Sequence, residues 1–539
     1  MPTCARRHWR IQVIGRAGAV CSASRPLGRG ATCRVGSASH EHWFGGALMP
    51  SKPTTRWQVS GYRFLVRRME HALVRRDVRM LHDPMRSQSR AYAAGLILGC
   101  VVLAGCGVLA LLRPQDKIGD SKILIGKDSG QVYASIDGVV HPALNLASAR
   151  LAVGDAAKAV IVKESELSKR PRGTLIGIPG APSALGFDTS GKGRAWTVCD
   201  ELKTDGSNAL SSTVIAGDPS LGEKVGVLAQ ERALLVQGKE SAYLIYANRR
   251  ARVDMADRAI TDALKIRGMT PRPISQGLLN AIPEVPPIER PKIDDPGGFP
   301  LKPIDNRRNG DVVRVSSENQ HYVVLRTGLQ PISPLTADII RNSNPTAGNY
   351  EITSYTRSYA DVVTPLSVQD YPETAPAIVD MKDQPVQCIS WKPLPVASDK
   401  ADGTRRAELS LITGRALPIP DNARPVQLAQ ADGTGANVAQ FYTKPGSGMF
   451  VQTTGIEPDS QRKDSLFYIA DTGVRYGIKD ADAQKALGMD SEHATPEPAP
   501  WPIVGLLPGG PALGRQDAMV AHDGVAPDAN PAKQLVQSK

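Results

Sequence analysis

The sequence predicts an α+β protein with a single transmembrane helix, followed by a β-rich core domain that carries four small repeat modules in a pseudo-two-fold arrangement of two halves. Three observations lead to this prediction: an uncharged apolar run of 22 residues, four similar segments further along the chain, and two cysteines at matching points of those segments. Glycine and proline make up 92 of the 539 residues, a share that favours turns and short strands over long helices.

The apolar run extends from Ala91 to Leu112 and reads AYAAGLILGCVVLAGCGVLALL. About 20 apolar residues in a helix span the hydrocarbon core of a bilayer, so the length fits a membrane span. A buried helix of a soluble protein normally shows a polar face, whereas this run carries no charged residue. A cleaved signal peptide would be shorter and would lie nearer the N-terminus. We therefore predict a transmembrane helix over 91–112.

Positive charge is concentrated before this run. Residues 1–90 hold 17 Lys and Arg against 4 Asp and Glu, whereas the rest of the chain holds 48 against 49. A nucleic-acid-binding domain needs a basic surface, so we expect no nucleic acid as a partner of the main domain. Residues 52–90 contain ten basic side chains, and the equally long stretch 113–151 contains five. By the positive-inside rule, the N-terminus is cytoplasmic and residues 113–539 lie outside.

The N-terminal region divides at Met49. Residues 1–48 contain seven Arg and no Lys and show no hydrophobic period, so we interpret them as a non-native or disordered extension. Residues 49–90 form a basic cytoplasmic arm whose pattern predicts an amphipathic helix. The apolar face of that helix consists of Tyr62, Leu65, Val66, Met69 and Leu73. Such a helix lies on anionic lipid or docks on a partner protein, and the sequence favours neither.

Four segments of the outer domain share a strand, a tight turn, a second strand and an Ala- and Leu-rich helical stretch. They begin at Val132, Ala242, His321 and Leu466. Turn sequences such as Asp-Gly and Thr-Gly suit hairpins. Each segment is followed by a closing in which a hydrophobic residue precedes spaced prolines, a pattern that ends strand pairing. The closings read IPGAP, IPEVP, YPETAP and LPGGP, from Ile178, Ile282, Tyr371 and Leu507.

The spacing of these segments is irregular, because their equivalent aromatic residues are 110, 79 and 145 residues apart: Tyr133, Tyr243, Tyr322 and Phe467. A stacked solenoid would have a nearly constant period. We predict instead two halves of two modules each, over residues 113–285 and 311–513, with a Pro-rich linker over 286–310 between them. A C-terminal tail is expected over 514–539.

The seven cysteines fall into three groups: Cys4, Cys21 and Cys33 in the extension, Cys100 and Cys106 in the span, and Cys199 and Cys388 in the outer domain. An isolated even pair in an oxidising compartment suggests a disulfide. Cys199 follows Tyr133 by 66 residues, and Cys388 follows Tyr322 by the same number. Equivalent places in two duplicated halves would bring the two cysteines together. Two unpaired buried thiols are the alternative.

The nearest match to a catalytic motif is GFDTSGKG at residues 186–193. Gly186, Gly191 and Lys192 fit the skeleton of a phosphate-binding loop, but Gly193 stands where a Ser or Thr would hold Mg²⁺. The residues that follow read as a strand rather than as the helix that should meet the phosphates. We therefore assign no catalytic residue, no metal site and no cofactor. The three residues are nucleotide candidates only if the protein hydrolyses ATP.

Six stretches, in order, span about nine-tenths of the chain from Trp57 onward: QVSGYRF from Gln58, HPALNLASARL from His141, LIGIPGAPS from Leu175, WTVCD around Cys199, GVRYGI from Gly473 and LLPGGPALGRQDAMVAHD from Leu506. In these stretches the chain resembles the EccB family, the core membrane components of type VII secretion systems. Residues 1–48 fall outside the resemblance.

The resemblance implies a structural core subunit of a type VII (ESX-type) protein secretion membrane complex, which anchors a periplasmic domain to the export machinery of the cell inner membrane. It implies assembly with a membrane ATPase of the FtsK/SpoIIIE type (EccC), with EccD and with EccE. For such a subunit we expect the outer domain to oligomerise or to contact the cell wall. The family is often labelled as an ATPase, so an ATP-hydrolysing component of the same complex is the alternative. A cell-wall-binding protein that acts alone is a third hypothesis.

Overall fold

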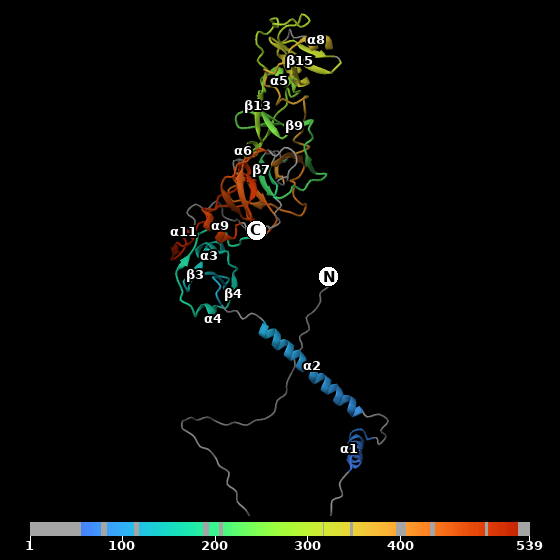
Figure 1. The fold of residues 1–539 in the computed structure, drawn as a ribbon, viewed down its shortest axis with the longest axis vertical. Coiled ribbons are helices and arrows are strands. Elements are labelled where there is room, and N and C mark those ends of the chain that lie inside the picture. The colour runs from blue at the N-terminus through green and yellow to red at the C-terminus, as the bar shows by residue number, and fades with distance from the viewer. Residues whose placement is uncertain are drawn as a thin grey trace, which may run out of the picture. The chain divides into compact units, whose positions relative to one another are not determined.

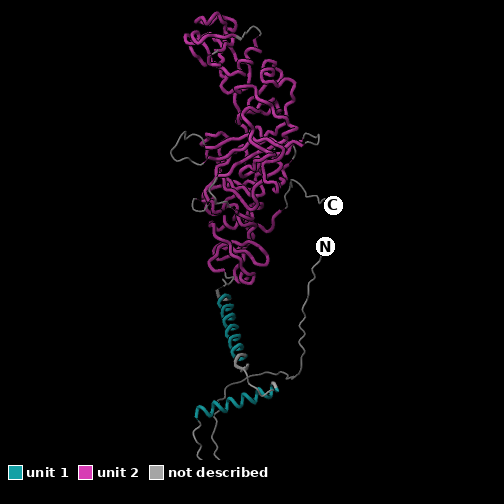
Figure 2. The backbone as a smooth tube through the Cα atoms, turned by 90° about the vertical axis from the view of Figure 1, so that its right-hand side faces the viewer, with its two compact units in different colours: residues 1–112 teal, residues 113–539 magenta. Residues whose placement is uncertain are grey.

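The structure is a computed structural model, and it describes residues 55–76, 84–112, 118–186, 193–203, 209–315, 317–344, 349–394, 406–431, 437–490 and 494–526. The chain divides into two compact units, Met1–Leu112 and Arg113–Lys539 (Figure 2). The predicted extension over 1–48 and the first residues of the arm lie outside the described part of the chain.

The first unit contains two helices. Helix α1 (Arg56–Arg75) begins at a capping box, in which the Thr55 hydroxyl accepts from the Gln58 backbone N–H and the Gln58 side chain accepts from the Thr55 backbone N–H. It ends at Arg76, whose left-handed conformation stops the helix. The predicted apolar face is on this helix, and Tyr62, Leu65 and Met69 are exposed.

Helix α2 (Pro84–Leu112) contains the predicted span and extends it toward the N-terminus. Its apolar stretch, Gln88–Leu109, is long enough to cross a membrane, and none of it is buried. It is the one helix of this kind among the residues that the structure describes. Pro84 at the first helical position fits, because proline has no backbone N–H to leave unpaired there.

Four sheets of the second unit share one order of elements. Figure 1 shows the ribbon of this unit, coloured along the chain. Three antiparallel strands are followed by a helix and by a fourth strand, which pairs in parallel with the first. A second helix then leads to a last segment, which lies parallel to the third strand. We name these units modules 1 to 4 in chain order.

Module 1 consists of β1 (Ile123–Gly126), β2 (Val132–Ile136), β3 (Val139–Ala143), α3 (Leu146–Val153), β4 (Val160–Val162), α4 (Glu164–Leu167) and β5 (Leu175–Ile176). Module 2 consists of β9 (Arg232–Gln237), β10 (Ala242–Tyr246), β11 (Arg249–Val253), α5 (Arg258–Ala263), β12 (Arg272–Pro273), α6 (Gln276–Asn280) and β13 (Glu284–Ile288). The short strand β18 (Ala377–Ile378) also pairs with β9.

Module 3 consists of β14 (Val312–Val315), β15 (Gln320–Leu325), β16 (Gly328–Ile332), α7 (Pro334–Ser343), β17 (Asn349–Ile352), α8 (Ser354–Tyr359) and a bridge at Val362. Module 4 consists of β23 (Met449–Thr454), β24 (Leu466–Ile469), β25 (Arg475–Gly477), α9 (Ala481–Leu487), β26 (Glu497–Pro500), α10 (Trp501–Val504) and a bridge at Gly509. The sequence segments therefore began at the second strand of each module and missed the first.

Local sequence explains the repeated geometry. Asp137 and Gly138 both have positive φ, as the tight turn between β2 and β3 requires, and Ala247 and Asn248 do the same between β10 and β11. The first helix of every module is capped by a side chain that accepts a backbone N–H of its first turn. These caps are Asn145, Asp257, Ser333 and Asp480.

A seven-stranded central sheet joins the modules. Its order is β21 (Val426–Gln427), β22 (Gln440–Tyr442), β7 (Leu210–Ala216), β6 (Trp196–Leu202), β19 (Val386–Pro393), β20 (Ala407–Gly414) and β8 (Val225–Val227). The middle pair, β6 and β19, brings together strands from the two predicted halves. Each half also lends a strand to the other, because β8 pairs with β20 and β22 pairs with β7.

The modules differ in how they bury their faces. Helix α3 packs on α9 and helix α5 on α7, so module 1 contacts module 4 and module 2 contacts module 3. Modules 2 and 4 share the largest hydrophobic core with the central sheet. Modules 1 and 3 each complete a small second core instead, which Ile118 and Leu167 cover in module 1 and Ile304 covers in module 3.

Three segments differ from the sequence prediction. The linker and the tail contain paired or packed residues, and module 3 ends before its closing sequence. Strand β13 and the buried Ile304 place paired and packed residues at both ends of the predicted linker 286–310. The predicted tail, 514–539, begins with α11 (Arg515–Ala518) on α3 and with β27 (Ala521–His522) beside β5. The last pairing of module 3 lies at Val362, before the closing sequence at Tyr371.

Candidate functional site

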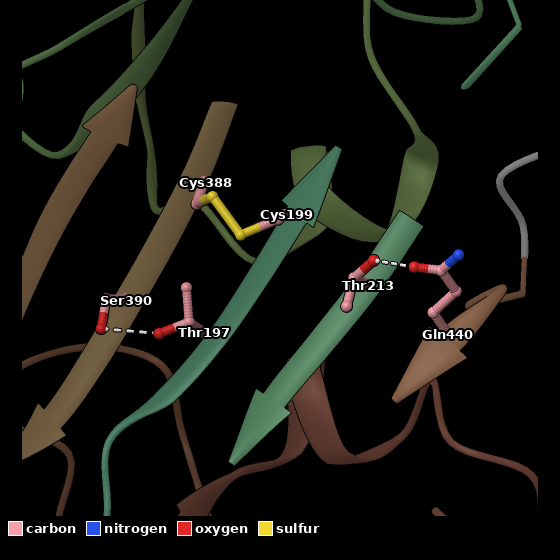
Figure 3. Close-up of a disulfide and its surroundings, with 6 residues drawn as sticks. All are labelled: Thr197, Cys199, Thr213, Cys388, Ser390 and Gln440. Atoms are coloured by element: carbon pink, nitrogen blue, oxygen red, sulfur yellow. Dashed lines mark hydrogen bonds between the residues drawn. A yellow bond between two sulfur atoms is a disulfide. The ribbon is translucent and has the colours of Figure 1, made fainter. Parts of the chain in front are cut away.

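The pairing of β6 with β19 sets Cys199 directly opposite Cys388, and the two are joined in a disulfide (Figure 3). The bond links residues 189 positions apart, and both cysteines are buried. On the same strands the Thr197 hydroxyl donates to the Ser390 hydroxyl at 2.9 Å. The expected pairing of the two outer cysteines is therefore present in the structure.

The two faces of the central sheet differ in what they pack against. The disulfide face forms a small core of its own with Ile215, Val225 and Ile412. The opposite face belongs to the large core shared with modules 2 and 4, to which β6 contributes Trp196 and Val198. Because side chains alternate along a strand, the residue next to each cysteine points to this second face.

Those neighbouring residues are Asp200 and Gln387, which are directly paired and almost fully buried. The Ser275 backbone N–H donates to Asp200 Oδ2 at 2.6 Å, and Gln387 Nε2 donates to the Pro273 carbonyl oxygen at 3.0 Å. Arg272 is buried beside them and donates from Nη2 to the Gln384 carbonyl oxygen at 3.0 Å. Together these bonds fasten the start of α6, in module 2, to the central sheet.

Burial dominates the electrostatics of this polar cluster. It raises the pKa of Asp200 to about 6, against the lowering effects of the Ser275 hydrogen bonds and of the Arg272 charge. Burial likewise lowers the pKa of Arg272 to about 10. Sequence reasoning missed this cluster, and its one available signal was a carboxylate inside the apolar strand WTVCDEL.

Of the nucleotide candidates, only Gly186 is among the described residues, and Gly191 and Lys192 lie outside them. A Cβ at Gly186 would stand 2.5 Å from the Gly446 carbonyl oxygen, so glycine is needed there for close packing on the segment before β23. The described chain resumes at Gly193 and enters β6 at Trp196. A phosphate-binding loop would lead instead into the N-terminus of a helix.

The described residues contain no group of three or more His, Cys, Asp or Glu side chains that could hold a metal ion.

A cleft of about 660 Å³ lies in module 2, beside β11 and β13. One carboxylate of its lining is that of Asp257, which accepts from Arg290 Nε at 2.7 Å and from Arg290 Nη2 at 2.8 Å. Arg290 hydrogen bonds lower the pKa of Asp257, so this carboxylate is held ionised and is unsuited to give up a proton at neutral pH.

Among the described residues, one exposed apolar helix is long enough to cross a membrane and is joined in sequence to a disulfide-linked, β-rich unit, an arrangement typical of the class of membrane-anchored proteins with a folded domain. The chain belongs to the EccB family: residues 51–527 match the family model described as "Type VII secretion system ESX-1, transport TM domain B". The family resemblance seen in the sequence is therefore confirmed.

Several curated relatives span nearly the whole chain. ESX-3 secretion system ATPase EccB3 of Mycobacterium tuberculosis (strain H37Rv) is 37% identical over 509 residues, covering 89% of this chain and 91% of the relative. ESX-1 secretion system ATPase EccB1 of the same strain is 33% identical, covering 89% and 97%. ESX-5 secretion system ATPase EccB5 of Mycobacterium marinum is 34% identical, covering 90% and 96%.

Solved structures agree with the fold. A chain of an intact ESX-5 inner membrane complex matches with a TM-score of 0.68 and 32% identity, covering 90% of this chain and 99% of that chain. A chain of the EccB3 dimer from the ESX-3 core complex matches with a TM-score of 0.63 and 33% identity, covering 74% and 100%. A mixed, β-rich α+β fold with one candidate membrane-spanning helix is thus confirmed.

Proposed function

We propose that this chain is a structural core subunit of an ESX-type type VII secretion complex and that it anchors a periplasmic domain to the inner-membrane export machinery. The observation that carries the proposal is the match of 90% of the chain to a chain of an intact ESX-5 inner membrane complex. The family membership over residues 51–527 supports the same role. Within the described residues, the strongest feature of the outer unit is a buried disulfide in a packed sheet, which suits a structural element.

The proposed topology places the N-terminus and α1 in the cytoplasm, α2 in the inner membrane and the second unit in the periplasm. The excess of basic residues before the apolar run supports this orientation. The Cys199–Cys388 disulfide supports it independently, because such bonds persist in oxidising compartments. A reporter fused after Lys539 should therefore be active only if it works outside the cytoplasm.

We further propose that the outer domain arose by repetition, with two halves, 113–285 and 311–513, related by a pseudo-two-fold axis. The shared order of elements in modules 1 to 4 supports the repetition. The direct pairing of Cys199 with Cys388, and the exchange of β8 and β22 between the halves, support the axis. The segments 1–48, 286–310 and 514–539 are then the extension, the linker and the tail of this plan.

The proposed partners are further copies of this chain, an EccC-type ATPase, EccD, EccE, the membrane and the cell wall. A neighbouring solved structure is an EccB3 dimer, which supports an oligomer. The exposed apolar residues of α1, among them Tyr62 and Met69, offer a surface for cytoplasmic partners. No nucleic acid is proposed, since the basic excess of the chain lies before the outer domain.

The proposal assigns no cofactor and no catalysis to this chain, and it leaves ATP hydrolysis to the EccC-type partner. ATP hydrolysis by this chain remains the alternative, which the names of the relatives suggest. The variants Lys192→Ala and Lys192→Arg separate the two in a strain that lacks the native gene. A structural subunit predicts normal secretion with both variants. Loss of secretion with Lys192→Ala alone, at an unchanged protein level, would support the ATPase.

A further inference from the structure

The contact between β6 and β19 is the long-range joint of the outer domain. Strands β6 and β7 are separated by seven residues of the chain, and β19 and β20 by 13, so the strands of each pair are close in sequence. No short connection aligns β6 with β19, because Cys199 and Cys388 are 189 residues apart. A slip of one residue between these strands would turn every side chain of one strand to the other face. The disulfide joins directly opposite residues and so excludes such a slip.

Register matters most at the next pair of residues, Asp200 and Gln387. Both lie on the face opposite the disulfide, and both bind the backbone of the 273–275 segment of module 2. That segment holds the cap of α6, because the Ser275 hydroxyl accepts from the Leu278 backbone N–H at 3.1 Å. Asp200 and Gln387, which come from different halves of the chain, must therefore lie side by side to hold the segment that begins α6.

We propose that the Cys199–Cys388 disulfide is a positioning bond: by fixing β6 on β19 it holds Asp200 and Gln387 where they dock module 2 on the central sheet. Module 2 is then coupled to the disulfide through the polar clamp formed by Asp200, Gln387 and the 272–275 segment. Without the bond, the clamp opens before the sheet unfolds. Modules 1 and 3, whose small cores include no residue of β6 or β19, keep their stability.

The polar clamp is sensitive to small displacements because its buried polar groups have few other hydrogen-bond partners. Among the described residues, Asp200 Oδ1, Gln387 Oε1 and two nitrogens of Arg272 have no hydrogen-bond partner. The bonds to Ser275 and Pro273 thus satisfy groups that would otherwise be buried and unpaired. A small displacement of β6 against β19 breaks these bonds, and water must then enter the joint to replace them.

Amide hydrogen exchange on the full-length protein in detergent tests this inference. The double variant C199S/C388S should speed exchange in the peptide covering 272–281 by about tenfold or more, because the Ser275 amide loses its buried acceptor on Asp200 and the cap of α6 is loosened. The peptide covering α3, residues 146–153, serves as the control and should exchange as in the native protein. Unchanged exchange over 272–281, or equally faster exchange in both peptides, would overturn the inference.

A second variant keeps the test valid if the double variant does not fold. Gln387→Ala leaves the disulfide in place but removes the bond to the Pro273 carbonyl, and it should also speed exchange over 272–281. The matched control is Gln330→Ala in module 3, where the Gln330 side chain both donates to and accepts from the Leu366 backbone. That variant should speed exchange around Leu366 only. Native exchange over 272–281 in Gln387→Ala would overturn the proposed clamp.

Discussion

Helix α2 and strand β6 are both strongly apolar, but they differ in the burial of their side chains. On α2 the apolar residues are exposed, with 58% of Val102 and 72% of Leu103 accessible. On β6 Trp196 and Val198 are fully buried. The chain itself supplies the packing partners of β6, from modules 2 and 4. Along the described length of α2, none of the apolar stretch Gln88–Leu109 is buried.

The difference assigns the two regions separate tasks. An apolar helix surface without protein partners is stable in a bilayer, where lipid tails replace the missing packing. The central sheet needs no such surroundings, because its core and its disulfide are internal. The first unit therefore carries the candidate membrane anchor, whereas the second unit has a packed core of its own.

Truncation in the sheet should give the largest effect. Trp196→Ala removes a fully buried side chain and should cost about 3–5 kcal/mol of the unfolding free energy of the outer unit. Leu103→Ala on α2 should leave that free energy unchanged. Denaturant unfolding of the full-length protein in detergent measures both. Equal losses in the two variants would show that α2 is packed against the outer unit and would break the comparison.

A charge in α2 should act on the membrane instead. Val102→Arg places a cation near the middle of the apolar stretch and should disfavour insertion by about 2.5–3.5 kcal/mol. The matched control is Val227→Arg on the exposed edge strand β8, which is similarly accessible but lies in the outer unit. Alkaline extraction of membranes measures the retained fraction. Full retention of the Val102→Arg protein would contradict a membrane-spanning α2.

The buried carboxylate of the central sheet predicts a pH effect confined to the outer unit. Because the pKa of Asp200 rises from 3.8 to about 6 on folding, its ionisation disfavours the folded state. The contribution of protonated Asp200 to the free energy of unfolding is fully present below about pH 3.8. It is lost as the pH rises through 6, a change on the order of 2–3 kcal/mol. Asp200→Asn should remove this pH dependence, whereas the exposed Asp459→Asn should not. If the thermal midpoints of the Asp200→Asn and native proteins were identical from pH 4 to 7, the predicted pH effect of Asp200 would be refuted.

The smallest effect concerns two helix caps. The Asn145 side chain accepts from the Ser148 backbone N–H at 2.9 Å and donates to the Ile178 carbonyl oxygen at 2.8 Å. Asn145→Ala should therefore destabilise the outer unit by about 1–2 kcal/mol. Thr55→Ala, at the cap of α1, should leave the thermal midpoint of the outer unit in place. A shift of that midpoint by Thr55→Ala would indicate coupling between the units.

Local patterns in the sequence were enough to find several features. The apolar run, the Asp137–Gly138 turn and the four helical stretches depend on neighbouring residues, so their positions could be predicted. The disulfide was predicted from an equal offset of 66 residues, which separates Cys199 from Tyr133 and Cys388 from Tyr322.

Features that depend on distant pairing could not be predicted in this way. Nothing near Val225–Val227 indicates that β8 leaves its own half and pairs with β20. Asp200 gains its buried environment only when residues 272–275 arrive from module 2. The first strand of each module was also missed, since it precedes the hairpin by a variable connection, as β1 and β23 show.

Affinity purification of the full-length protein from membranes in mild detergent tests the central claim most directly. A structural core subunit anchored by α2 should bring with it the membrane ATPase and the other membrane subunits of the secretion complex, together with further copies of itself. The Val102→Arg protein should lose these companions, whereas the Val227→Arg protein should keep them. Recovery of the native protein alone from intact membranes, with no secretion subunit attached, would contradict the account.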